Sequence, residues 1–231
     1  MDEIKEDLNI GIVLQYTLNP NHHSEINTDI LVRQARDSGF RGVSIENADE
    51  LQRKLMAEAC EKYAIKFCQT RPAIPLQGPD VLAKLIAARL DGYNIYFKVA
   101  LTAEGKITEN EIPDLDILRQ WLDRFGHAYY EARPEHEITT TANASIFRND
   151  IANYQIYVFI HQPLASTITL HHVPEIKTIM WIDTRKELNF KQKGDEVTIE
   201  LQRDPDDAEF TIYGLRLQAH RPEDDIKETK Y

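Results

Sequence analysis

The residues Tyr93–Ile107, YNIYFKVALTAEGKI, decide the fold of this chain. Within them, Ile95–Leu101 is an apolar run of strand length. The segment Ile117–Gly126 follows with apolar residues at helical spacing, and AYYEARP at Ala128–Pro134 completes the unit. A strand followed by a helix is the repeat of βα proteins, so the sequence predicts a parallel sheet.

Three more strand and helix pairs precede this unit. The expected strands are Ile10–Tyr16, Gly42–Ile45 and Ile65–Gln69, and the expected helices are Asn27–Ser38, Asn47–Tyr63 and Val81–Leu90, with the last helix over Asp116–Phe125. Asn47 is expected to cap its helix, because its side chain can accept a hydrogen bond from the first turn. Pro72, Pro75 and Pro79 indicate a loop.

After Pro134 the pattern changes to short alternating or β-branched runs, which are typical of an antiparallel β-sandwich. These runs are Ile138–Thr141, Tyr154–Ile160, Thr167–Leu170, Ile176–Trp181, Glu196–Leu201 and Phe210–Leu217. Lys193-Gly194-Asp195 predicts a hairpin turn. We therefore expect an α/β domain over residues 1–135, an all-β domain over 136–222 and a tail over 223–231.

The first stretch and the later strands resemble the α-L-fucosidase family of glycoside hydrolases. In that family the last strand of the catalytic barrel reads roughly GNLLLNIGPTADGxI, and a WLxxxG helix and an exit ending in TRP follow it. Trp121-Leu122, Gly126 and Arg133-Pro134 stand at the corresponding positions. The segment KELNFKQKGDEVTI at Lys186–Ile199 is similar to the family's C-terminal β-sandwich. The resemblance extends from Gly92 to Leu217.

The resemblance implies a partial TIM-like barrel of about four βα units, followed by a small antiparallel β-sandwich. A complete barrel takes roughly 200–250 residues, which is more than the chain offers before Pro134. The family's nucleophile is an aspartate in a W-x-D motif at the end of a middle barrel strand. Here Asp123 belongs to an expected helix and Asp183 to the expected sandwich. Lys98 replaces the asparagine of the family's last strand.

These departures imply an α-L-fucosidase-like protein that lacks hydrolase activity and has a carbohydrate-binding or regulatory role. Two alternatives stay open at this point. One is an active glycoside hydrolase whose carboxylates have moved to new positions, and the other is a protein-interaction or assembly module.

Candidate site residues follow the expected strands, where βα folds place their sites. Glycosidases use two carboxyl groups, about 5–5.5 Å apart in retaining enzymes and roughly 6.5–9.5 Å apart in inverting ones. Glu46 and Glu104 are the candidate catalytic pair, against the plainer interpretation that both are loop carboxylates. The candidate substrate-binding residues, whose side chains can hydrogen-bond to sugar hydroxyls, are Gln15, Tyr16, Gln69, Arg71 and Lys98.

Composition limits the remaining functions. The 38 acidic residues outnumber the 27 basic ones, and a net charge of -11 argues against a nucleic-acid partner. No apolar run is long enough to span a membrane, and the N-terminus lacks the apolar segment of a signal peptide, so we expect a cytoplasmic protein. Cys60 and Cys68 have no metal-ligand spacing, and we expect no metal and no cofactor.

Four parallel strands cannot close into a barrel, so the sheet would keep two unpaired edges. One solution is an open, flavodoxin-like sheet with helices on both faces. The other is a homodimer in which two half-barrels meet, and the expectation is self-association of this kind.

Overall fold

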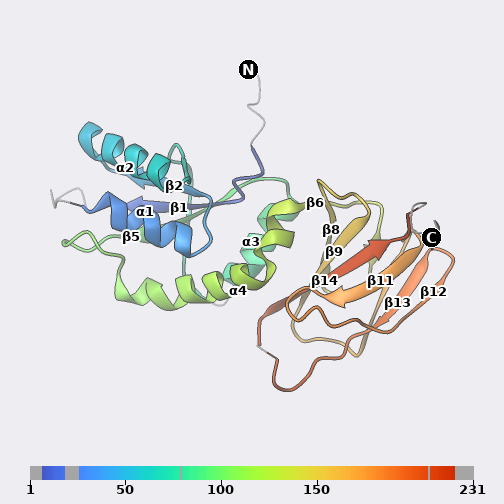
Figure 1. Ribbon diagram of the computed structural model, residues 1–231. Helices are drawn as coiled ribbons and strands as arrows, with labels where there is room; N and C mark the ends of the chain where they lie inside the picture. Colours follow the sequence, from blue (N-terminus) through green and yellow to red (C-terminus); the bar gives the residue numbers. More distant parts are fainter. Residues whose placement is uncertain (1–6, 19–25, 79, 208, 222–231) are drawn as a thin grey trace, which may run out of the picture. The chain divides into compact units, whose positions relative to one another are not determined.

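The computed structural model describes residues 7–18, 26–78, 80–207 and 209–221. By its internal contacts the chain divides into two compact units, Met1–Gly126 and His127–Tyr231. Helices occur in the blue-to-green part of the chain, and the yellow-to-red part is built of strands (Figure 1). The mixed α/β class is confirmed. The domain limits at 135 and 222 stay predictions, and the expected tail over 223–231 lies outside the described residues.

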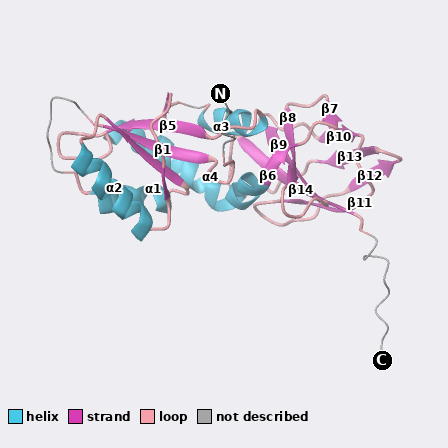
Figure 2. Cartoon of the chain, turned by 90° about the horizontal axis from the view of Figure 1, so that it is seen from above, coloured by secondary structure: helices cyan, strands magenta, loops and turns pink. Residues whose placement is uncertain are grey.

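A five-stranded parallel sheet forms the centre of the first unit. Its strands are β1 (Ile12–Thr17), β2 (Gly42–Glu46), β3 (Lys66–Phe67), β4 (Ile74–Pro75) and β5 (Ile95–Ala100). Their order across the sheet is β3-β2-β1-β5-β4, so the last strand pairs with the first. Figure 2 shows β1 and β5 side by side. β4 was expected to be loop because of its prolines, but an edge strand tolerates proline.

The register of the sheet places one polar residue from each of three strands in a row. Gln15 lies opposite Ser44 on one side and Lys98 on the other. Because side chains alternate between the faces of a sheet, these three residues share one face. The neighbouring row, which contains Leu14, is fully buried on the opposite face.

The helices of this unit are α1 (Thr28–Asp37), α2 (Glu50–Lys62), α3 (Val81–Leu90) and α4 (Ile112–Glu131), with a 3-10 turn at Glu109–Glu111. The α3 bounds agree with the prediction. α4 is longer than expected at both ends. Its earlier start includes Pro113, and proline is tolerated in the first helical turn. Among the helices that the structure describes, none combines the length and the apolar character that a membrane span requires.

The N-terminus of α2 corrects one prediction. Asp49, rather than Asn47, is the N-cap: its side chain accepts a hydrogen bond from the Gln52 backbone N–H at 2.8 Å, and the Gln52 side chain accepts one from the Asp49 N–H at 3.0 Å. This reciprocal pair is a capping box. Asn47 instead adopts a positive φ of 60° and donates from its side chain to the Leu18 carbonyl.

Replacing Asp49 with alanine is expected to destabilise the protein by about 1 kcal/mol, because the Gln52 backbone N–H loses its capping acceptor. Asp80 provides a matched control: it is the N-cap of α3, but its side chain makes no capping hydrogen bond. Asp80→Ala should therefore change stability by much less. Urea denaturation of both variants measures the difference, and equal losses would contradict the assignment of the cap.

Two antiparallel sheets form the second unit. One has the order β12-β13-β10-β7 and the other β11-β14-β9-β8-β6. The strands are β6 (Ala132–Pro134), β7 (Thr139–Thr140), β8 (Ala144–Asn149), β9 (Gln155–His161), β10 (Thr167–His171), β11 (Ile176–Trp181), β12 (Phe190–Lys193), β13 (Glu196–Glu200) and β14 (Ile212–Ala219). The predicted hairpin is confirmed, since Lys193 pairs with Glu196 around Gly194-Asp195. β6, β8 and β12 were not among the expected runs.

Candidate functional site

A polar cavity of about 410 Å³ lies on the face of the parallel sheet that carries Gln15 and Lys98. We call it the polar pocket, and its lining consists of Gln15, Glu46, Thr70, Arg71, Pro72, Ala73 and Lys98. Three of the predicted substrate-binding residues and one of the two predicted catalytic carboxylates therefore meet here. They come from β1, β2, β5 and the segment between β3 and β4.

The topology explains why this segment reaches the pocket. β3 and β4 are the two opposite edges of the sheet, and only residues 68–73 connect them. Four strand spacings measure roughly 19 Å, and the extended chain from Phe67 to Ile74 reaches at most roughly 25 Å. The segment must therefore run almost directly across the face. The Arg71 backbone N–H donates to the Gln15 side-chain oxygen at 3.1 Å and fixes the crossing above β1.

Gln15 is the best-defined residue of the pocket. Its side chain is only 3% exposed. Its Oε1 atom accepts hydrogen bonds from Ser44 Oγ at 3.0 Å and from the Arg71 N–H. A backbone N–H can only donate, so this contact fixes the orientation of the amide. The Nε2 group is then left as a donor toward the pocket, with no protein acceptor among the described residues.

The charged residues of the pocket are Lys98, Arg71 and Glu46. The Lys98 side chain is exposed and makes no ion pair with any residue that the structure describes. Arg71 is a lining residue. Burial raises the pKa of Tyr96, and the positive charge of Arg71 opposes that rise. Glu46 Oε2 accepts a hydrogen bond from Thr17 Oγ1 at 3.1 Å. The pocket thus combines two cations with one carboxylate.

The other predicted site residues lie elsewhere. Tyr16 is fully buried on the opposite face, and its hydroxyl donates to the Leu31 carbonyl at 2.8 Å, so it is a core residue and not a substrate contact. Burial raises its pKa. Strand alternation explains the error, because Tyr16 is one residue from Gln15 and must face the other way. Gln69 is exposed and precedes the pocket-lining segment.

Glu104 lines a different cavity, of about 430 Å³, together with Asn27, Ile30 and Gln34 at the start of α1. Glu46 and Glu104 therefore line different cavities of the described part of the chain, and their role as a catalytic pair stays a prediction. The aspartates of the two Trp-x-Asp sequences also lie outside the polar pocket. Asp123 is exposed on α4, and Asp183 forms a buried ion pair with Arg203.

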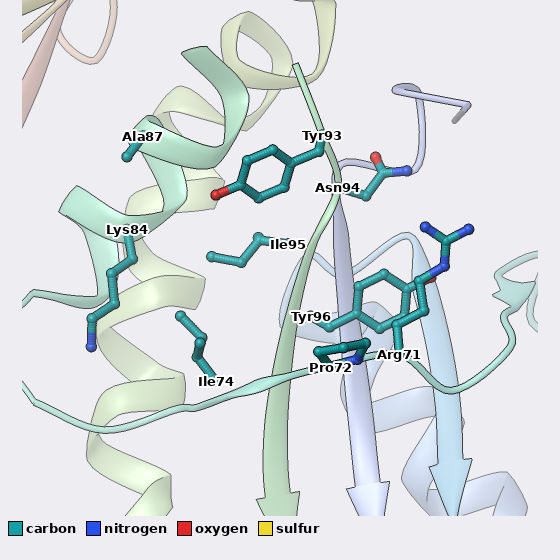
Figure 3. A pocket seen from close by; sticks show the side chains of 9 residues that line it. All are labelled: Arg71, Pro72, Ile74, Lys84, Ala87, Tyr93, Asn94, Ile95 and Tyr96. Carbon is teal, nitrogen blue, oxygen red and sulfur yellow. The ribbon is translucent and has the colours of Figure 1, made fainter. Parts of the chain in front are cut away.

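A third cavity, of about 520 Å³, lies beside β5 and was not foreseen from the sequence. Figure 3 shows its lining: Arg71, Pro72, Ile74, Lys84, Ala87, Tyr93, Asn94, Ile95 and Tyr96. β4 pairs with Phe97 and Lys98, so Ile95 and Tyr96 of β5 have no strand partner on that side among the described residues. We call this space the edge cavity.

No protein-family model matches the sequence, and no curated protein matches it either. Several solved structures, however, are similar to this chain. An α-fucosidase from Thermotoga maritima, in complex with fucose, is similar with a TM-score of 0.72 at 9% identity, over 91% of this chain and 96% of that one. α-L-fucosidase isoenzyme 1 from Paenibacillus thiaminolyticus gives a TM-score of 0.73 at 8% identity, over 92% and 98% of the chains.

A third similar structure, a GH29 α-L-fucosidase from Bacteroides thetaiotaomicron, has a TM-score of 0.67 at 9% identity, over 91% of this chain and 93% of that one. At such identities the likeness shows the fold alone. The fold of this chain is therefore α-L-fucosidase-like, as the residues of the first stretch and the later strands had indicated.

Proposed function

We propose that this α-L-fucosidase-like protein binds carbohydrate in the polar pocket and does not hydrolyse it. The observation that carries the proposal is the meeting of Gln15, Glu46, Arg71 and Lys98 on one face of the sheet. An amide, a carboxylate and two cations offer the directed hydrogen bonds that sugar hydroxyls require. The proposal rests on this site and on the fold.

We further propose that the first unit is a shortened barrel and the second a β-sandwich. Read across the sheet, the strand order is β4-β5-β1-β2-β3. The strands therefore follow one another in chain order in a single direction, and the last strand, β5, lies beside the first, β1. A closed (β/α)8 barrel has the same relation between its last and first strands. The Gln15 face would then correspond to the barrel interior, and residues 68–73 would cover it. The two antiparallel sheets support the sandwich.

The absence of a carboxylate pair supports loss of hydrolysis. Both glycosidase mechanisms need two carboxyl groups at defined separations. Glu46 is the one carboxylate in the described lining of the polar pocket, and Glu104 lines another cavity. Asp183, in the second Trp-x-Asp sequence, is held by Arg203.

Hydrolysis assays test this proposal. Pure protein should show no turnover of aryl α-L-fucoside, or of other aryl glycosides, between pH 4 and pH 8, while isothermal titration with monosaccharides should show binding. Turnover that is present in the unaltered protein and lost in Glu46→Gln would contradict the proposal. It would instead favour an active hydrolase with carboxylates at new positions.

A second candidate function is self-association or assembly through the open sheet. The edge cavity beside β5 favours it, because Ile95 and Tyr96 have no described strand partner on that side and Tyr93 there is 46% exposed. Uncovered strand edges invite pairing with another chain. We propose a homodimer formed at this edge. A light-scattering mass equal to one chain at micromolar concentration would contradict it.

We also propose a cytoplasmic location. Cys60 and Cys68 are both free thiols, which is the usual state of cysteine in a reducing compartment.

A further inference from the structure

The groups that the polar pocket offers to a ligand are mostly donors. Gln15 Nε2 is held in place by the two hydrogen bonds to its oxygen and has no protein acceptor among the described residues. Lys98 can only donate as well. Thr70 adds a hydroxyl. Of these three side chains, Gln15 and Lys98 cannot accept a hydrogen bond in the orientation that they have.

Acceptors are scarce in comparison. Glu46 is the single carboxylate of the lining, and one of its oxygens already accepts from Thr17. A neutral sugar carries hydroxyl groups, each of which both donates and accepts, so a site for it needs acceptors as well as donors. A carboxylate or phosphate only accepts. The pocket therefore complements an anionic group better than a set of hydroxyls.

The charge of the pocket supports the same conclusion. The whole chain has a net charge of -11, yet Lys98 of this lining has no ion-pair partner among the described residues. Gln15, the least exposed of these polar residues at 3%, belongs to the lining, and its Nε2 donor has no acceptor among the described residues. An exposed lysine on its own would be an ordinary surface residue, but a buried and oriented amide donor next to it makes a built site.

We infer that the polar pocket takes a monosaccharide that carries a negative charge, either a carboxylate or a phosphate, and that Lys98 and Gln15 contact the charged group. Glu46 is then left to accept from a sugar hydroxyl. The inference rests on the proposed carbohydrate-binding function and names the class of sugar. Hydrogen bonds to charged groups are the stronger ones, and the contact should dominate the affinity.

Isothermal titration with matched sugar pairs tests the inference. The probes are D-galacturonate against D-galactose, and D-glucose 6-phosphate against D-glucose, with acetate and inorganic phosphate as sugar-free anions. At least one charged sugar should bind about tenfold or more tightly than its neutral partner. The pair in which this occurs distinguishes carboxylate from phosphate recognition. The preference should shrink as salt is added, because ions screen the contact.

Lys98 variants separate the charge contact from the rest of the site. Lys98→Met should weaken binding of the charged sugar about tenfold or more, and by a larger factor than it weakens binding of the neutral sugar, while Lys98→Arg should retain most of the affinity. Lys54→Gln is the matched control, since Lys54 is an exposed lysine on α2 outside the pocket. Equal urea midpoints for the three variants would show that all are folded.

The outcomes distinguish the inference from the proposed function. Equal affinity for charged and neutral sugars, or full binding by Lys98→Met, would overturn the inference and leave sugar binding intact. Binding of no sugar at all would overturn both. Acetate or phosphate binding as tightly as the charged sugars would also overturn both, because the pocket would then recognise an anion without the sugar.

Discussion

Replacing Arg203 with methionine is expected to lower the free energy of unfolding by about 3–5 kcal/mol, because it leaves a buried carboxylate without its partner. Arg203 donates to both oxygens of Asp183, at 3.2 and 2.7 Å. The side chains are 10% and 4% exposed. The guanidinium also lies 4.9 Å from the ring centre of Trp181 and 4.2 Å from that of Tyr213. Urea denaturation measures the loss.

Lys186→Met is the matched control for this prediction. Lys186 forms an ion pair with Asp204 in the same unit, but both side chains are about half exposed. Exposed pairs contribute about 0–1 kcal/mol, so the control should change little. The double variant Asp183→Leu with Arg203→Met should recover part of the lost stability, because the buried charge is then gone as well. A loss in Arg203→Met no larger than in the control would contradict the burial of this pair.

Gly42→Ala is expected to destabilise the protein by about 1–3 kcal/mol, because there is no space for an added methyl group. A Cβ atom at Gly42 would lie 2.9 Å from Val13 Cγ2 and 3.0 Å from both Cys68 Sγ and Ile10 Cγ2. Cys68 begins the segment that crosses the sheet toward the polar pocket. Displacing it should also loosen the bond between Arg71 and Gln15, so we expect weaker ligand binding together with the lower urea midpoint.

The same substitution at Gly126 should have the opposite effect on the free energy of unfolding. A Cβ atom there would meet only Leu122, at the ordinary contact distance of 3.7 Å, and Gly126 lies inside helix α4. Alanine is favoured over glycine in a helix interior by about 0.5–1 kcal/mol. Gly126→Ala should therefore leave stability unchanged or raise it. A destabilisation equal to that of Gly42→Ala would mean that close packing at Gly42 is not the cause.

The sequence predicted those features of the fold that depend on local periodicity. β1, β2, β5 and α3 lie within two residues of their expected bounds, since each carries its own apolar pattern. Features that depend on long-range pairing were not predictable. β4 consists of Ile74 and Pro75, and it forms only because β5 presents an edge to it. Its position at the far edge is what draws residues 68–73 across the sheet.

The candidate site shows the same division. Gln15, Arg71, Lys98 and Glu46 line one cavity, as the shared edge of parallel strand ends favours, and their roles stay predictions. Tyr16 was assigned to the wrong face of the sheet. The face to which a strand side chain points depends on the register of the whole sheet, and a single sequence does not give that register. Glu104 lies in a loop whose direction no spacing fixes. The roles of Gln15 as an oriented donor and of residues 68–73 as a cover required coordinates.

The central claim, that sugar binds in the polar pocket, is tested most directly by mapping backbone amide shifts in a ¹H–¹⁵N spectrum. D-galacturonate and D-glucose 6-phosphate are added in turn to the full chain. The account predicts that the largest shifts occur at Gln15 and Lys98, which line the polar pocket alone, and at Thr70 and Ala73. Shifts centred on Tyr93 and Asn94 of the edge cavity, shifts in the second unit, or an unchanged spectrum would contradict it.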